Sequence, residues 1–194
     1  MKFMILPGLL ALIAVPSASL AAAPVFAVVK TGSAVTFHVN ASTTVEGRFD
    51  KWTSSLTFTS PNISTGVFRL KADANSVDTG DGMKNGVLKG DKFFDAQNYP
   101  VVSFGSTRFS QTGPNSVAVT GVFRLRGVSK PQTLLLTTTR AGGSIREIKG
   151  TMTFNRKDYG MNGGIPFVRI SDRVDVAIDL KVRRVSGPPV ALKR

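Results

Sequence analysis

The sequence contains no cysteine and only one histidine, His38. The lack of cysteine excludes disulfide bonds, thiol nucleophiles and zinc sites built on thiolates. His38 alternates with Phe37 and Val39, so we expect its ring to point away from the apolar face of a strand into solvent, rather than to act as a base or a metal ligand. Cysteine and histidine chemistry is therefore not where the function of this chain lies.

Acidic residues are also scarce, with 12 Asp and Glu against 25 Lys and Arg, which gives the 194-residue chain a formal charge of +13. Hydrophobic residues make up 42% and charged residues 19%, so the chain can bury the core of one domain and lacks the composition of a disordered segment. Several basic residues are dispersed over different predicted strands and form no stripe with exposed aromatics. This pattern argues against nucleic acid as a partner and favours transient contact with an anionic membrane surface. The dispersed residues are Arg48, Arg69, Arg124, Arg126 and Lys181.

Residues 1–21 have the order of a secretory signal: a basic start at Lys2, an apolar stretch over residues 3–15, and small residues from 16 onward. The apolar stretch is shorter than the roughly 20 residues that a membrane span needs, and Pro7 and Gly8 interrupt it. We therefore predict a cleaved signal peptide at residues 1–21. Export of a chain without cysteine favours the bacterial periplasm.

Beyond residue 21 the dominant hydrophobic period is two, which is the period of a half-buried strand. Turn-forming residues separate the alternating segments, so the sequence predicts an antiparallel sandwich or barrel. Gly47, Gly121 and Gly150 lie inside such segments, where a bend or bulge is expected, and bent strands favour closure into a barrel. The apolar positions of the clearest segments are Val35, Phe37 and Val39; Phe68, Leu70 and Ala72; Val117, Val119, Phe123 and Leu125; Ile148, Met152 and Phe154; and Val174, Val176, Ile178, Leu180 and Val182.

Two stretches depart from the strand pattern. In residues 79–100, Met83, Val87 and Leu88 have helical spacing, but four glycines restrict any helix to one or two turns, which we expect to cap one end of the barrel. Residues 183–194, which contain a Gly-Pro-Pro sequence, predict a basic flexible tail. The barrel domain itself is expected to span residues 22–182.

Two possible ligand motifs fail on their spacing. The Gly80-x-Gly82-x-x-x-Gly86 run is one residue too long for a dinucleotide fingerprint and does not lie in a strand-helix-strand unit. Asp73, Asn75, Asp78 and Asp81 do not have the spacing of a calcium-binding loop, so turn and capping roles are expected for them. The sequence thus predicts no metal site and no catalytic group, and it favours a binding protein over an enzyme.

A series of short motifs, read in order, resembles the successive signatures of the YceI-like family over about residues 25–182. This resemblance implies an exported, lipocalin-like antiparallel β-barrel of about eight strands that binds a polyisoprenoid or a similar amphiphile in its interior. Lys84 and Val87 stand where many members have Arg and His, and Tyr159 replaces the usual Phe. The motifs are Ser76-Val77-Asp78-Thr79-Gly80, Leu88, Phe93-Phe94-Asp95, Tyr99-Pro100, Phe104-Gly105-Ser106, Gly121, Leu125-Arg126-Gly127-Val128-Ser129-Lys130-Pro131 and Arg156-Lys157-Asp158-Tyr159-Gly160-Met161.

The predicted binding residues fall into a wall and a mouth. Wall residues lie on the more apolar face of their strands, and we expect some of them to line the cavity and others to pack the barrel ends. The mouth residues lie in the loop of residues 79–95 and in Arg156-Lys157-Asp158, which the resemblance places among its motifs. Asp158 lies two residues after Arg156, and we expect these two side chains to form a structural ion pair at the rim. The predicted wall is Phe37, Phe68, Phe104, Val119, Phe123, Met152, Phe154 and Ile178, and the predicted mouth is Lys84, Phe93, Phe94, Arg156 and Asp158.

Three functions remain open at this stage. The first is a carrier that holds an amphiphilic lipid, either a polyisoprenoid or a prenylated quinone, with no other cofactor. The second is an enzyme that acts on an amphiphile, and the third is a basic interaction module with a filled interior. A barrel of about eight strands is just wide enough either to fill itself with side chains or to hold one ligand, and the sequence does not decide between these states. It also leaves open whether the protein forms a homodimer.

Overall fold

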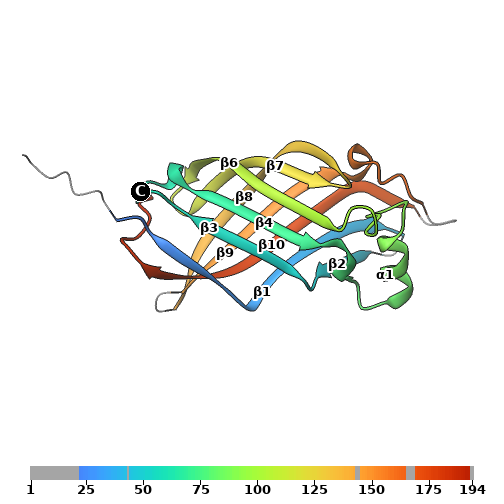
Figure 1. The fold of residues 1–194 in the computed structure, drawn as a ribbon, viewed down its shortest axis with the longest axis horizontal. Coiled ribbons are helices and arrows are strands. Elements are labelled where there is room, and N and C mark those ends of the chain that lie inside the picture. Colours follow the sequence, from blue (N-terminus) through green and yellow to red (C-terminus); the bar gives the residue numbers. More distant parts are fainter. Residues whose placement is uncertain (1–21, 43, 143–144, 165–168, 193–194) are drawn as a thin grey trace, which may run out of the picture.

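The computed structural model describes residues 22–42, 44–142, 145–164 and 169–192, which fold into an antiparallel β-barrel with one short helix at one end (Figure 1). The described part of the chain contains ten strands, three single 3₁₀ turns and the helix. The strands are β1 (Val25–Ala41), β2 (Val45–Phe49), β3 (Trp52–Thr57), β4 (Val67–Asp73), β5 (Val77–Asp78), β6 (Val101–Gly113), β7 (Ser116–Leu125), β8 (Val128–Gly142), β9 (Ile145–Asn155) and β10 (Ile170–Ser186). The 3₁₀ turns are η1 (Ile63–Thr65), η2 (Ala74–Ser76) and η3 (Arg156–Tyr159), and the helix is α1 (Gly82–Lys89).

The ten strands occupy eight positions around the barrel. β2 and β3 both pair with β1 and follow one another along it, so together they occupy one position in the barrel. β4 pairs with β3 and β5 pairs with β2, so β4 and β5 together occupy the next position. From β4 the sheet continues through β6, β7, β8 and β9 to β10, and β10 pairs with β1. This last pairing closes the sheet on itself. The predicted all-β, lipocalin-like antiparallel barrel of about eight strands is therefore confirmed.

The predicted alternation places the apolar side chains inside. In β10, Val174, Ile178, Leu180 and Val182 are buried, whereas Val176 stays partly exposed although it faces inward. The interior is rich in aromatic rings that meet edge to face, such as Phe49 and Phe94 with ring centroids 5.6 Å apart. Such ring pairs add about 0.5–1.5 kcal/mol each to the gain from burial.

The short helix predicted in residues 79–100 is also confirmed. Asp81 caps α1, because its carboxylate accepts from the backbone N–H groups of Met83 and Lys84. A series of contacts between side chains then fixes the helix to the barrel. The Oδ1 of Asn85 accepts from the hydroxyl of Thr79 at 2.8 Å, and its Nδ2 donates to Asp78 at 3.1 Å. Asp78 in turn forms an ion pair with Arg48 of β2 at 2.8 Å. The helix is thereby held at one end of the barrel, where Figure 1 shows it in green.

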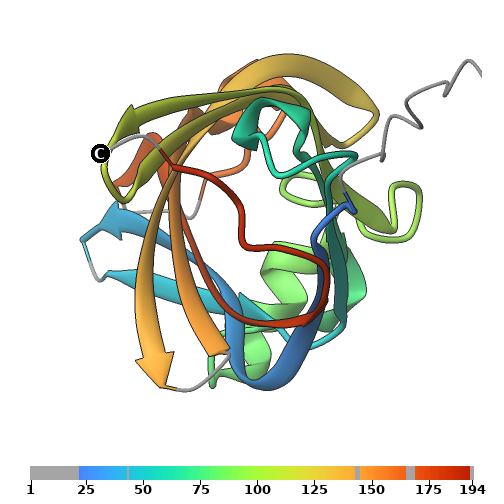
Figure 2. The same cartoon turned by 90° about the vertical axis from the view of Figure 1, so that its left-hand side faces the viewer.

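Residues 183–192 differ from the predicted flexible tail. β10 continues to Ser186, and residues beyond it turn back across the barrel end opposite α1 (Figures 1 and 2). Ala191 forms a bridge with Asn62 and donates its N–H to the carbonyl of Pro61 at 2.8 Å. Val190 and Leu192 hold the segment in place by packing against the core. Because basic residues and prolines surround them, the sequence does not indicate this packing.

The strand glycines have a different role from the one expected at two of three positions. Gly47 and Gly150 lie in regular ladders, and a Cβ there would strike the ring of Phe37 or the side chain of Leu136. Only Gly121 lies beside an irregularity, the register shift in β6 after Ser106. These glycines therefore mainly make room for large inward side chains.

We predict that Gly121→Ala destabilises the barrel by about 1–3 kcal/mol, the usual cost of overpacking. The added Cβ would lie 2.5 Å from the carbonyl oxygen of Gly105, and backbone there cannot move aside easily. Gly105→Ala is the matched control, because its Cβ meets no atom within 4 Å. Urea unfolding measures both variants, and equal stability for the two would contradict this account of Gly121.

Candidate functional site

The interior of the barrel holds a cavity of about 250 Å³ beside α1, which we call the helix-end cavity. Its lining is almost wholly apolar and comes from strands all round the barrel and from the segment that follows β5. The side chains with a polar group are Thr36, Lys84, Ser103 and Arg156. The other lining residues are Val35, Phe37, Val39, Val45, Phe49, Leu70, Ala72, Met83, Val87, Leu88, Phe93, Phe94, Val102, Phe104, Phe123, Leu125, Leu134, Met152, Phe154, Met161, Ile170, Val174, Val176 and Ile178.

The structure brings most of the predicted wall residues to this cavity and leaves two out. Phe68 and Val119 are only 2% and 0% exposed, and they lie deeper in the barrel without lining the cavity. The ring of Phe68 instead packs against Phe104, with centroids 6.3 Å apart. The wall residues that do line the cavity are Phe37, Phe104, Phe123, Met152, Phe154 and Ile178.

Four of the five predicted mouth residues also line the cavity: Lys84, Phe93, Phe94 and Arg156. Asp158 does not, because it lies on the exposed side of η3 and its carboxylate is 3.4 Å from the Nζ of Lys130. The predicted ion pair between Asp158 and Arg156 is therefore wrong.

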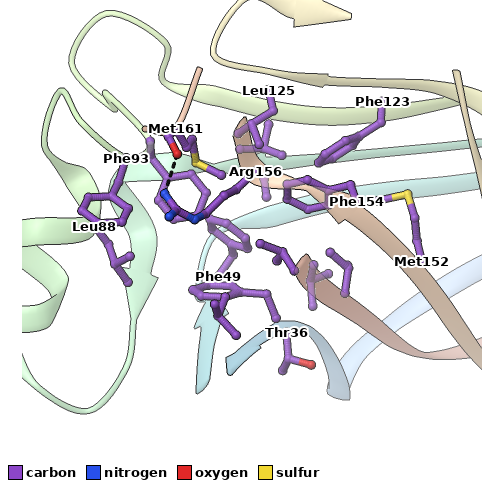
Figure 3. Close-up of a pocket in the computed structure, with 18 of the residues that line it drawn as sticks. Thr36, Phe49, Leu88, Phe93, Phe123, Leu125, Met152, Phe154, Arg156 and Met161 are labelled. Atoms are coloured by element: carbon purple, nitrogen blue, oxygen red, sulfur yellow. Dashed lines mark hydrogen bonds between the residues drawn. The ribbon is translucent and has the colours of Figure 1, made fainter. Parts of the chain in front are cut away.

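Arg156 is the only charged residue in the described part of the chain that is buried, with 6% exposure. Its Nη1 donates to the carbonyls of Met161 at 2.6 Å and Gly163 at 2.8 Å, and its Nε donates to the carbonyl of Ser171 at 3.1 Å. Its Nη2 lies 3.1 Å from the Oδ1 of Asp172, which supplies the neutralising charge. Figure 3 shows this guanidinium among the apolar side chains of the cavity.

These contacts give Arg156 two roles. A guanidinium has five N–H groups; the three hydrogen bonds above use three of them, and its Nη2 group forms the ion pair with Asp172. The bonded groups tie the segment after η3 and the start of β10 to the barrel. Because Arg156 also lines the cavity, it holds a fixed guanidinium beside a surface that is almost wholly apolar.

The Asp172 carboxylate also binds Lys157, whose Nζ lies 2.9 Å from its Oδ2. The hydrogen bond from Lys157 lowers the pKa of Asp172 below its ordinary value, and the positive charges of Lys157 and Arg156 act in the same direction. The carboxylate is thus kept ionised, which the buried guanidinium requires.

The helix end of the cavity is closed by α1 and the loop after it. Met83 is 82% exposed and Val87 is 39% exposed, yet both line the cavity, so these apolar side chains lie between solvent and the interior. Lys84 lies between them, and its Nζ is 3.9 Å from Asp81.

Arg126, in the tight turn between β7 and β8, donates to the carbonyls of Asp91 at 2.7 Å and Phe93 at 2.8 Å. It thereby fixes the loop that carries Phe93 and Phe94. Sequence reasoning assigned Arg126 to the dispersed basic surface, although its place in a motif was a signal of a specific role.

Tyr159, where the resemblance expects Phe, packs behind the wall. Its ring meets Phe123 and Phe154 edge to face, with centroids 5.4 and 5.3 Å away. Burial raises the pKa of the Tyr159 phenol, while Gln132 donates to its oxygen at 3.4 Å. The raised pKa keeps the hydroxyl neutral. Tyr159 is not among the residues that line the cavity.

The fold and this site define a closed antiparallel β-barrel with an internal apolar cavity that one buried arginine borders. Residues 26–182 match the family described as "YceI-like domain". The chain therefore belongs to the YceI-like family.

Known relatives agree with this assignment. A "UPF0312 protein" of Shewanella denitrificans is 27% identical over 140 residues, which cover 70% of this chain and 73% of the relative. The crystal structure of Burkholderia cenocepacia BcnA is similar at a TM-score of 0.73 and 25% identity, covering 80% of this chain and 99% of that one.

A third relative is similar in fold. It is a polyisoprenoid binding domain from Saccharophagus degradans, implicated in plant cell wall breakdown, with a TM-score of 0.64 and 20% identity over 83% of this chain and 99% of that one.

Among the described residues of our chain, no helix is long and apolar enough to cross a membrane.

We predict that Lys157→Met raises the pKa of Asp172 towards its ordinary value. Because the folded-state pKa of Asp172 is lowered, its ionised form stabilises the fold above the unfolded-state pKa of about 3.9, and this stabilisation is lost as the pH falls through the folded-state value. Acid unfolding of Lys157→Met should therefore begin at a higher pH than in the wild type.

Carboxyl chemical shifts measured through a pH titration check the first statement, and circular dichroism through the same range checks the second. Lys130→Met is the matched control, because Lys130 pairs with the exposed Asp158 and not with Asp172. An equal shift of the Asp172 pKa in both variants would refute the assigned cause.

Proposed function

We propose that this protein is an exported carrier that binds a polyisoprenoid or a similar amphiphilic lipid, such as a prenylated quinone, in the helix-end cavity. The observation that carries the proposal is the lining itself: rings and aliphatic side chains surround one fixed arginine donor. An apolar cavity with a few placed polar groups is typical of small-molecule sites. The description of the Saccharophagus domain supports the ligand class.

The cavity volume bears on how the ligand is held. About 250 Å³ is slightly below the roughly 300–1,000 Å³ of sites for drug-sized ligands, so it accommodates only part of a long isoprenoid chain. The rest of the chain must displace side chains or leave past α1. Met83 and Val87 are exposed to solvent and also line the cavity, so an apolar chain can leave along these apolar side chains of α1.

Energetics favour carriage over permanent storage. Burial of apolar groups from water gains roughly 0.8 kcal/mol per CH₂, which for a long isoprenoid would exceed the practical limit of about 20 kcal/mol. A bilayer, however, is already apolar, and moving a lipid from it into the barrel changes the burial of carbon very little. A small net difference lets the protein take up a lipid at one membrane and release it at another.

Ionisable groups at the cavity favour binding over catalysis. Of the described lining residues only Lys84 and Arg156 are ionisable, and an arginine does not lose its proton in proteins. Within the described ranges, no group of three or more His, Asp or Glu side chains is placed to hold a metal ion. We therefore prefer a carrier to an enzyme that acts on an amphiphile, and the open cavity speaks against a barrel with a filled interior.

Arg156 and Lys84 are the groups proposed to meet the ligand's polar end. Arg156 offers the Nη2 side of a fixed guanidinium, and Lys84 offers a flexible point charge where the resemblance expects the planar fork of arginine. The exposed Met83 and Val87 beside Lys84 suit brief contact with an anionic membrane surface. We place the protein in the periplasm on the signal-like residues 1–21, which lie outside the described part of the chain, and the proposal requires no homodimer.

We predict that organic extraction and mass spectrometry of the protein from its native host recover a prenyl lipid in near-stoichiometric amount. Val176→Phe should reduce this lipid at least tenfold, because the ring would fill part of the cavity that Val176 lines. Because the ring can enter the cavity, the cost in stability should lie at the lower end of the roughly 1–3 kcal/mol that overpacking costs.

Val122→Phe is the matched control, since Val122 lies on the outer face of β7 with 42% exposure and does not line the cavity. Lipid-free wild-type protein that also refuses added polyprenyl compounds would overturn the proposed function. Equal lipid content in the two variants would remove the helix-end cavity as its site.

Salt should separate capture from retention. Attraction between this strongly basic protein and anionic vesicles is screened over about 8 Å at physiological salt, so lipid capture from such vesicles should slow markedly between low and physiological salt. Retention of bound lipid should barely change, because burial of an apolar tail is insensitive to screening. Stopped-flow transfer of a fluorescent prenyl lipid measures both rates. The same salt dependence for both, or none for capture, would deny the basic surface a role in delivery.

A further inference from the structure

A second cavity, of about 520 Å³, lies at the barrel end opposite α1, and we call it the strap-end cavity. Its apolar lining includes Phe26 of β1, Phe58 just after β3, and Phe109 of β6. The strap is residues 187–192, which cross this end of the barrel after β10 and are seen in dark red in Figure 2. The bridge between Ala191 and Asn62 holds the strap, and Val190 and Leu192 line the cavity from it.

A layer of side chains divides the two cavities. Along β10, Ile178 lines the helix-end cavity and Val182 lines the strap-end cavity, whereas Leu180 between them lines neither. Phe68 and Val119 likewise line neither cavity. All three are at most 2% exposed. The predicted wall residues that miss the helix-end cavity are thus part of a partition, and the strap-end cavity is a separate space.

Two arginines line the strap-end cavity from adjacent strands. Arg146 continues the inward alternation of Ile148 in β9, and Arg184 continues that of Val182 in β10. Arg146 pairs in register with Val182, and Arg184 pairs with Phe26 across the β1–β10 seam. The two side chains therefore start from neighbouring positions at the open rim of the barrel, where both are exposed to solvent and line the cavity.

These arginines differ from Arg156 in their charge balance. Arg184 donates from Nη1 to the carbonyl of Gly187 at 2.6 Å, which directs it towards the strap. Neither arginine has a carboxylate within salt-bridge distance among the described residues, and no described acidic residue lines the cavity. Two neighbouring guanidinium groups beside three phenyl rings form a surface that suits a ligand with an anionic group and an apolar body.

We propose that the strap-end cavity is a second binding site, which takes a compact anionic amphiphile: a carboxylate or phosphate monoester on a single short hydrocarbon chain. The anion bonds Arg146 and Arg184, and the hydrocarbon chain lies against Phe26, Phe58 and Phe109. This site differs from the proposed polyisoprenoid site in place, in charge and in ligand size. It stands whether or not the helix-end cavity carries a prenyl lipid.

Calorimetric titration of the delipidated full chain with dodecanoate, dodecyl phosphate and dodecanol tests the site. We expect both anions to bind, and the doubly substituted variant Arg146→Gln/Arg184→Gln to bind them at least tenfold more weakly, since bonds to charged groups are worth about a factor of ten or more each. Dodecanol affinity should not change. Comparison of the two anions then identifies whether a carboxylate or a phosphate is the better head group.

Arg183→Gln is the matched control, because Arg183 is exposed on the outer face of the same strand and does not line the cavity. It should leave the affinity for both anions within twofold of the wild type. Anion binding that is absent, or that is equally strong in the doubly substituted variant, would overturn the proposal. So would an equal loss in Arg183→Gln, which would show attraction by net charge alone.

The Val176→Phe variant separates this site from the proposed function. It should lose prenyl lipid and keep anion binding, whereas Arg146→Gln/Arg184→Gln should do the reverse. Loss of both ligands in both variants would show one continuous tunnel and overturn the second site while leaving the carrier function intact. Loss of prenyl binding alone in the wild type would overturn the carrier function and leave the second site standing.

Discussion

The ladder between β1 and β10 is the interaction on which the rest of this structure depends. It joins the first and last strands of the barrel, and so gives every alternating side chain a fixed inner or outer face. Its register also builds both cavities: Val35 faces Ile178 and Phe37 faces Val176 at the helix end, while Phe26 faces Arg184 at the other end. A sheet left open along this seam would have neither cavity, and it would expose two long strand edges to aggregation.

The two ends of one closed wall are completed by different means. At the helix end, a capped helix and a loop held by Arg126 cover an apolar space, and the single buried cation there is neutralised by Asp172. At the opposite end, a strap of apolar and proline residues covers a space in which arginine charge has no acidic partner within the described ranges. At each end a backbone carbonyl of the cover accepts from an arginine of the barrel, Phe93 from Arg126 and Gly187 from Arg184, in addition to the packing of the cover's own apolar side chains.

Much of the fold could be predicted because it depends on local sequence period, whereas the site depends on pairings between distant segments. Alternation identified Phe123, Met152 and Ile178 as inward residues, and the spacing of Met83, Val87 and Leu88 identified the helix. Alternation does not give depth along the barrel, so it could not separate Phe68 and Val119 from the cavity lining. Proximity in sequence suggests Asp158 as the partner of Arg156. The actual partner is Asp172 of β10, which is too far along the chain for the sequence to indicate the contact.

Two residues of α1, Lys84 and Val87, bear on what the helix-end cavity can recognise. Val87 brings no hydrogen-bond donor to α1, and Lys84 lies 3.9 Å from Asp81, so the helix contributes little fixed polarity to the cavity. Recognition of a head group then falls mainly to Arg156, whose orientation three backbone carbonyls and one carboxylate already determine. Because three of its five N–H groups are bonded to carbonyls and its charge is matched by Asp172, this guanidinium suits a head group that accepts a single hydrogen bond, such as a hydroxyl or a quinone carbonyl, better than a phosphate that needs a bidentate fork. On the proposed function, this chain is therefore tuned towards weakly polar prenyl lipids.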